Sequence, residues 1–285
     1  MTRGCEAGTP RYTGMGDGVR KLKFDYEMKL SFSAPVSDHR FQLRCVPATG
    51  PRQQVVDVEV VLEPHIEPDR SIDSFDSIVL TGLIAPPHDT FGYTVTGIAF
   101  VDTEHTKPEP YKPLYRFNTP LTTPGEAVEA LIGLCRTRVG GLGEGTSDVD
   151  RAQQIMHEVY RAFVYTPGST TIRTTAEQAL AQRRGVCQDY AHVMLSVCRA
   201  LGLTARYIAG LLCGEGATHA WVEVYHNGRW IGLDPTHDRM VDDTYITLAH
   251  GRDYRDCMLD IGIFSSQGQV EQRQWVNASV HEQRI

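Results

Sequence analysis

Cys187 lies in the stretch RRGVCQDYAHVMLSVCRALGL, residues 183–203, just after Gly185 and at the start of a run with helical periodicity. The first backbone amides of a helix lack partners within the helix, and the helix dipole favours negative charge there. We therefore expect a thiolate at Cys187 to be stabilised and able to act as a nucleophile. The same amides are placed to accept the negative charge of a tetrahedral intermediate.

A base and an orienting acid are found in the stretch THAWVEVYHNGRWIGLDPTHD, residues 218–238. This stretch predicts a β-hairpin, because Asn227 and Gly228 form a strong two-residue turn signal between two strand-like runs. With that turn, Trp221 is opposite Asp234, and His219 lies two residues further along the same face. Diagonal neighbours on one face are roughly 7–8 Å apart, which is within reach of a His–Asp hydrogen bond. Such a bond would hold the imidazole with its other nitrogen free for a thiol.

Each of these three residues also has an ordinary structural interpretation. A lone cysteine near a helix start is more often a small buried residue than a nucleophile. A histidine at a strand end can be a satisfied structural residue, and an aspartate before a proline commonly starts a turn. The occurrence of all three, in this order and in this predicted local structure, favours the catalytic interpretation.

Three neighbouring residues can support the site. Gln188 and Asp189 directly follow Cys187, and they can help orient the site or cap the helix. Trp221 lies on the same strand as His219 and can be either a core residue or the wall of a groove. The side-chain donor of an oxyanion site is not identified by any pattern in the sequence.

The first part of the chain has the pattern of β-strands. From Leu22 to about Val101, KLKFDYEMKLSF and four further segments show strand periodicity and are divided by Pro, Gly and Asp turns. Several strand-like segments in succession predict an antiparallel β-sandwich or β-barrel. Residues 103–125 carry five prolines among 23 residues and have no clear period, which is typical of a linker.

Helical periodicity follows the linker. Two of the helical segments begin with capping-box signals, one at Ser147 and one at Thr175. We therefore predict an α+β protein with an N-terminal β domain over residues 18–110 and a second, α+β domain over residues 120–285.

Composition and charge narrow the possible partners. The chain has 285 residues, of which 41% are hydrophobic and 22% charged, as in ordinary globular proteins. Its formal net charge is −7 and its arginines are scattered, so nucleic acid is not an expected partner. No apolar run approaches the roughly 18 residues of a membrane span, so we expect no membrane partner.

The cysteine pattern indicates free thiols. Seven cysteines are spread along the chain with neither a CxxC motif nor the spacing of a structural zinc site, which fits a reducing compartment. The N-terminal residues lack the apolar core of a signal peptide, so we expect a cytoplasmic location. We expect neither a metal nor another cofactor to be needed.

The residues around these candidates resemble the core of the transglutaminase-like superfamily, in its bacterial form. The matching stretches are GVCQDYAHVMLSVCRALGLTARYIAGLL, THAWVEVYHNGRWIGLDPTH and YITLAHGRDYRDC. In the first domain, LSFSAPVSDHRFQLRCVP and PHDTFGYTVTG resemble the β domain that precedes this core in many bacterial members.

The resemblance implies a papain-like α+β fold for the second domain and a catalytic triad of Cys187, His219 and Asp234. The sequence departs from the family's pattern in three places. DSFDSIVLTG replaces the usual D-x-F-G-N, His237 stands where an asparagine is common, and DCMLDIG lacks a proline.

A cysteine, histidine and aspartate so arranged imply acyl transfer through a thioester on a peptide or protein substrate. We expect hydrolysis of an amide bond, as in a cysteine peptidase or amidase. A transglutaminase, in which an amine takes the place of water, is the first alternative. A non-catalytic peptide-binding module is the second.

Overall fold

Strand β1 (Arg20–Leu43) organises the first sheet of the computed structural model, which describes residues 18–284. Its side chains alternate between buried and exposed from Leu22 to Phe32, as the sequence predicted. The first half of β1 pairs antiparallel with β5 and β14, and its second half with β4 and β13. The other strands of this sheet are β2 (Gln53–Glu63), β3 (Asp69–Ile72), β4 (Ile78–Ile84), β5 (His88–Val101), β13 (Asp260–Ser265) and β14 (Gln272–Gln283).

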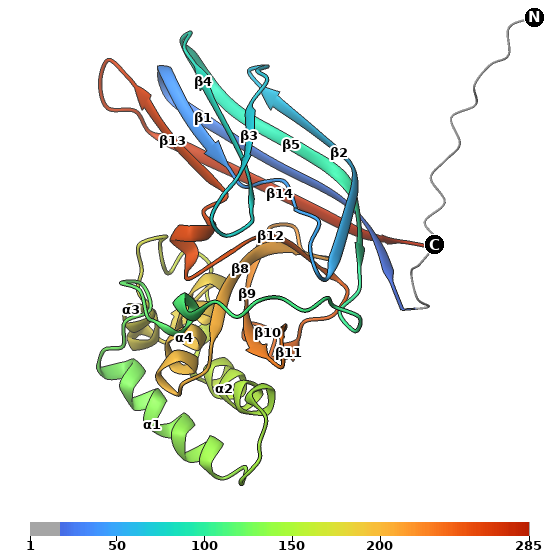
Figure 1. The fold of residues 1–285 in the computed structure, drawn as a ribbon. Coiled ribbons are helices and arrows are strands. Elements are labelled where there is room, and N and C mark those ends of the chain that lie inside the picture. The colour runs from blue at the N-terminus through green and yellow to red at the C-terminus, as the bar shows by residue number, and fades with distance from the viewer. Residues whose placement is uncertain (1–17, 285) are drawn as a thin grey trace, which may run out of the picture.

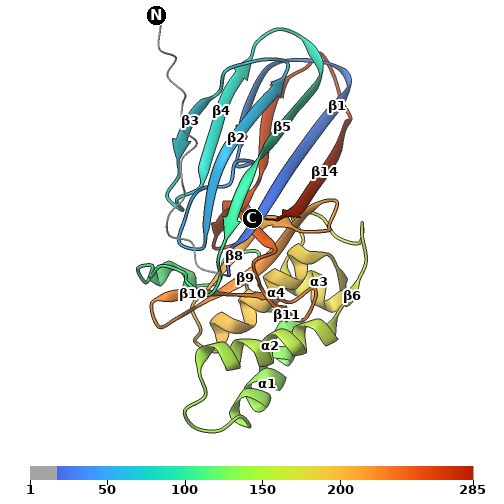
Figure 2. The same cartoon turned by 90° about the vertical axis from the view of Figure 1, so that its right-hand side faces the viewer.

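These seven strands form a curled antiparallel sheet that stands above the helical part of the molecule (Figure 1). Two of them, β13 and β14, come from the C-terminal end of the chain and pair with β1. Figure 2 shows β14 beside β1. The sequence prediction placed all of residues 120–285 in the second domain. The structure differs, because the last two strands complete the first sheet by covering an edge of β1.

The second region has four helices and a five-stranded sheet in the order β11-β10-β9-β8-β12. The helices are α1 (Glu126–Gly140), α2 (Asp148–Ala162), α3 (Ala176–Gln182) and α4 (Cys187–Ala200). The strands are β8 (Ala205–Leu212), β9 (Thr218–His226), β10 (Arg229–Asp234), β11 (Arg239–Met240) and β12 (Tyr245–Gly251). Shorter elements are η1 (Pro113–Arg116), β6 (Val164–Tyr165), β7 (Arg184–Gly185) and η2 (Tyr254–Cys257).

Helix α4 is the central helix of this region. Eleven of its 14 residues are buried, because it packs against the sheet at β8 and β9 and against the other three helices. Helices α2 and α3 begin at the capping boxes predicted at Ser147 and Thr175, whose hydroxyls accept the N–H groups of Asp150 and Gln178. Because α4 packs against the sheet and three helices, the position of its first turn, which contains Cys187, is fixed.

The two sheets are joined by polar contacts. The side-chain amide of Gln53 on β2 donates to the carbonyl of Thr247 on β12 and accepts from its N–H, both at 2.8 Å.

The predicted linker is held by an ion pair. Arg206 on β8 forms ion pairs with Glu223 at 2.7 Å and with Glu109 of the linker at 3.2 Å. The linker is thus bound to the second region rather than free.

None of the helices within residues 18–284 combines the length and the apolar character that crossing a membrane would require.

Candidate active site

Cys187 is the first residue of α4, as the sequence predicted. The helix is capped by Asp189, whose buried carboxylate accepts the N–H of Val186 at 2.8 Å and the hydroxyl of Thr170 at 2.6 Å. A Cβ atom on Gly185 would come within 2.7 Å of the Asp189 side chain, so a glycine is needed beside this cap. Of the two roles considered for Asp189, capping is the one that its hydrogen bonds show.

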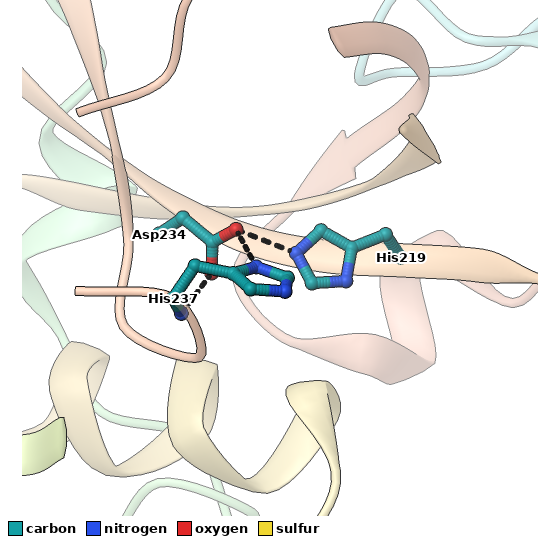
Figure 3. A group of neighbouring side chains, drawn as sticks. All are labelled: His219, Asp234 and His237. Carbon is teal, nitrogen blue, oxygen red and sulfur yellow. Dashed lines mark hydrogen bonds and ion pairs between the residues drawn. The ribbon is translucent and has the colours of Figure 1, made fainter. Parts of the chain in front are cut away.

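His219 and Asp234 meet through the predicted hairpin. Asn227 and Gly228 form its turn, with φ values of 49° and 80°, and Arg229 pairs with His226. This register brings the Nε2 of His219 within 2.8 Å of the Oδ2 of Asp234 (Figure 3). The other ring nitrogen, Nδ1, is left for a different partner.

Asp234 is fully buried and accepts hydrogen bonds from several directions. Its Oδ2 accepts from His219, from Nδ1 of His237 at 2.7 Å and from the hydroxyl of Tyr245 at 2.8 Å. Its Oδ1 accepts from the N–H groups of Thr236 and His237. Burial alone would raise the pKa of Asp234, but the hydrogen bonds from both histidines outweigh it and hold this pKa well below its usual value.

The sequence singled out His237 only as a departure from the family's pattern, and it did not single out Tyr245. His237 lies three residues after Asp234, which is close enough for a turn to fold its ring back onto the carboxylate. Tyr245 comes from a different strand, β12, and local spacing gives no signal for such a contact.

His219 is also buried, and its ring is flanked by Trp221 at 6.3 Å between centroids and 25° between planes. Burial lowers the pKa of His219, but hydrogen bonds with Asp234 and Cys187, together with their charges, raise it to about 10. The imidazole is therefore held as an imidazolium between a carboxylate and a sulfur. Trp221 is fully buried, so its place is in the core beneath the histidine.

Glu215 adds a second carboxylate at the rim of this group. Its two oxygens lie 3.7 Å from Nδ1 of His219 and 3.3 Å from Nε2 of His237. The side chain is one-third exposed, so water screens its charge more than that of Asp234.

A cavity of about 310 Å³ opens over Cys187 and His219, and Gln188 lines it as well. Both sheets supply its walls. The first sheet contributes Tyr26, Asp260, Gln274 and Val276, and the second region contributes Tyr165, Tyr207, Ala209, Thr218, Ala220 and Tyr254 among others. A substrate bound at the thiol would therefore contact both parts of the molecule.

His219, Asp234 and His237 are also close enough to hold a metal ion, since one ligand atom of each lies within 4.8 Å of the others. In the structure those atoms are joined by the hydrogen bonds that orient His219. A metal ion at these atoms would have to replace the protons in these bonds, and it would break the hydrogen bond between His219 and Asp234. The arrangement fits proton transfer better than metal binding.

Comparisons with known proteins match two parts of the chain to known families. Residues 136–235 match the family described as the transglutaminase-like superfamily, and residues 22–99 match the bacterial transglutaminase-like N-terminal region. The fold is similar to that of a Cytophaga hutchinsonii protein provisionally assigned as a cysteine protease. That similarity has a TM-score of 0.68 and 21% identity, and it covers 94% of this chain and 93% of that one.

Several curated proteins are similar in sequence. An uncharacterized protein of Mycobacterium leprae is 28% identical over 258 residues, 84% of this chain and 91% of that protein. An uncharacterized protein of Mycobacterium tuberculosis is 41% identical over 124 residues, 38% of this chain and 40% of that protein. A protein-glutamine gamma-glutamyltransferase of Pseudomonas aeruginosa is 32% identical over 98 residues, 30% of this chain but only 14% of that enzyme.

The chain thus belongs to the transglutaminase-like superfamily, with the N-terminal region of its bacterial members. As a member it is an enzyme of the cysteine-dependent kind.

Proposed function

We propose that this protein hydrolyses an amide bond of a peptide or protein substrate through a thioester on Cys187. The observation that carries the proposal is the placement of His219, which contacts Cys187 on one side and Asp234 on the other. This is the order of groups that nucleophilic catalysis by a thiol requires.

The proposed reaction has two steps. In the first, the Cys187 thiolate attacks the amide carbonyl carbon, and the His219 imidazolium gives its proton to the leaving amine as the C–N bond breaks. In the second, His219 takes a proton from water, the resulting hydroxyl attacks the thioester, and the acid product leaves Cys187. Asp234 keeps the imidazole aligned throughout.

The negative charge that develops on the carbonyl oxygen needs donors in both steps. In the first turn of α4 the N–H of Asp189 donates to the carbonyl of Val186 at 2.8 Å, so the N–H groups of Cys187 and Gln188 are the candidate donors. Because α4 is held by packing along its length, these donors do not have to reorganise during the reaction.

Transglutaminase activity is the second candidate. The similarity to the curated gamma-glutamyltransferase over 98 residues favours it, and the first step would be the same. The two activities differ only in whether water or an amine reaches the thioester. We place hydrolysis first because it needs no second binding site for an amine.

The test incubates the protein with a glutamine peptide or an amide-bond peptide library, with and without a primary amine. Acid products that persist in the presence of the amine support hydrolysis, and predominant amine incorporation would reverse the ranking. Cys187→Ser should remove at least about 10³-fold of the rate. Cys213→Ser is the matched control, since Cys213 is a partly exposed thiol outside the site.

The non-catalytic alternative is tested by thiol reactivity. Dilute iodoacetamide should label Cys187 much faster than Cys213, with both sites followed by peptide mass spectrometry. Equal, slow labelling would favour a binding module.

We further propose a cytoplasmic location, on the basis of the cysteine pattern alone.

A further inference from the structure

Asp260 is a carboxylate in the wall of the Cys187 cavity that the reaction described above does not use. It begins β13, where it pairs with Leu43 of β1, and its Oδ2 accepts a hydrogen bond from the Gln274 amide of β14 at 2.8 Å. The side chain is therefore fixed by two strands of the first sheet, and it lines the same cavity as the nucleophile of the second region.

The His219 imidazolium lines the same cavity, but no cation within residues 18–284 is paired with this carboxylate. None of the arginines, lysines and histidines within residues 18–284 forms an ion pair with Asp260, and neither a lysine nor an arginine lines the cavity. Burial raises the pKa of Asp260, since the hydrogen bond from Gln274 offsets only part of the cost of desolvation. A positive charge brought in by a ligand would lower that cost.

The remaining polar lining of the cavity suits a cation as well. Four tyrosines contribute to it, Tyr26, Tyr165, Tyr207 and Tyr254. Burial raises the pKa of each of them, so they stay neutral near pH 7 and add no competing charge. The faces of neutral aromatic rings attract cations, and a carboxylate with several tyrosines is a common way to bind an alkylammonium or guanidinium group.

The cavity therefore combines two kinds of chemistry. Cys187 and His219 line it and carry the proposed reaction. Asp260 lines it too, and its carboxylate adds to the effect of burial in raising the pKa of Tyr26 and Tyr254. A substrate bound in the cavity would place an amide at Cys187 and a second group at the carboxylate.

We propose that Asp260 is a specificity residue that selects amide substrates carrying an alkylammonium or guanidinium group beside the carbonyl that Cys187 attacks. The proposal rests on the proposed function, because it assumes that this carbonyl is bound at Cys187. It names the chemical class of the substrate, which neither the triad nor the superfamily determines.

The test compares two thiol reagents of similar size and opposite charge, 2-(trimethylammonium)ethyl and 2-sulfonatoethyl methanethiosulfonate. With either reagent the Cys187 thiolate attacks the sulfenyl sulfur, a mixed disulfide forms and methanesulfinate leaves. The second-order rate constants at Cys187 are measured in the full chain by peptide mass spectrometry. We expect the cationic reagent to react at least about tenfold faster in the wild-type protein.

Asp260→Asn keeps the size of the side chain and an acceptor for Gln274 but removes the charge. We expect it to lower the ratio of cationic to anionic rates at least about fivefold. Asp69→Asn is the matched control, because it removes an equal charge from an exposed position on β3 outside the cavity. It should leave the ratio unchanged. Asp260→Ser replaces Asp260→Asn if circular dichroism shows that the latter does not fold.

An unchanged ratio in the folded Asp260 variant, or a wild-type ratio at or below one, would overturn the proposal. Failure of the proposed function gives a different result. In that case iodoacetamide would label Cys187 no faster than Cys213, whereas the charge ratio at Cys187 can still be measured, since these reagents modify any accessible thiol.

Discussion

Asp234 accepts five hydrogen bonds, two of them from histidine rings and two from backbone N–H groups. So many donors fix both carboxylate oxygens, and they keep the group ionised although it is fully buried. Its charge is in turn one of the causes that hold His219 as an imidazolium. At the scale of single residues, Asp234 and His219 each stabilise the charged form of the other.

The pH dependence of activity follows from this chain. The pKa of His219 is raised from 6.5 to about 10, so the imidazolium that donates to the leaving amine persists above neutral pH and is lost only as pH rises through about 10. We expect kcat/KM to keep its value from neutral pH to about pH 9 and then to fall. The measurement is kcat/KM between pH 6 and 11, with a check that the protein stays folded.

Asp234→Asn supplies the control for this pH profile. It removes the first-named cause that raises the pKa of His219, so the alkaline fall should move toward neutral pH and the rate should drop by roughly 10³-fold. A wild-type profile that already falls near pH 7 would contradict the imidazolium form.

At the scale of elements, the sequence predicted what is local and missed what is distant. The start of α4 was predicted from the helical periodicity that follows Gly185, and the register of the hairpin from a two-residue turn; the structure has both where they were predicted. The return of β13 and β14 to β1 joins residues more than 200 positions apart, and periodicity carries no information on such pairing. Asp260 reaches the cavity through distant pairing of this kind. Tyr245 is only 11 residues from Asp234, but it reaches the carboxylate because β12 joins the same sheet at β8, so the sequence singled out neither residue.

Strand β8 shows how tightly one element must fit its neighbours. A Cβ atom on Gly210 would lie 2.2 Å from the carbonyl oxygen of Ile246 and 2.4 Å from the ring of Trp221, on which His219 rests. Since one of these atoms belongs to the backbone, the overlap cannot be relieved by a side chain turning away. We expect Gly210→Ala to lower the free energy of unfolding by about 2–4 kcal/mol and to reduce activity, because Trp221 must move.

Urea denaturation with a fluorescence readout measures this change in stability. Gly133→Ala on α1 is the control, because a Cβ there meets no atom within 4 Å and alanine favours a helix by about 1 kcal/mol over glycine. It should therefore be neutral or stabilising. Equal stability of the Gly210 and Gly133 variants would mean that β8 and β12 can separate more easily than the structure indicates.

At the scale of the whole molecule, one cavity depends on two sheets. The nucleophile and base come from the second region, whereas Asp260 and Gln274 come from strands of the first sheet that follow the second region in the chain. Shifting the sheets relative to each other would separate the proposed specificity residue from Cys187 without changing either one. The polar contacts between the sheets therefore matter for function as well as for stability.

Replacing Gln53 tests whether the cavity depends on the contact between the sheets. The buried side chain of Gln53 forms a reciprocal pair of hydrogen bonds with the backbone of Thr247, and it donates a third to the carbonyl of Ala48. Gln53→Ala leaves the Thr247 groups unsatisfied between the sheets, so we expect a loss of about 2–4 kcal/mol in the free energy of unfolding. Gln54→Ala, at the partly exposed next position of β2, should cost less than about 0.5 kcal/mol. We expect Gln53→Ala also to lower the ratio of cationic to anionic reaction rates at Cys187 while leaving its iodoacetamide rate nearly unchanged, since the triad lies within the second region. A Gln53 variant that loses stability but keeps the wild-type ratio would show that the cavity holds its shape without this contact.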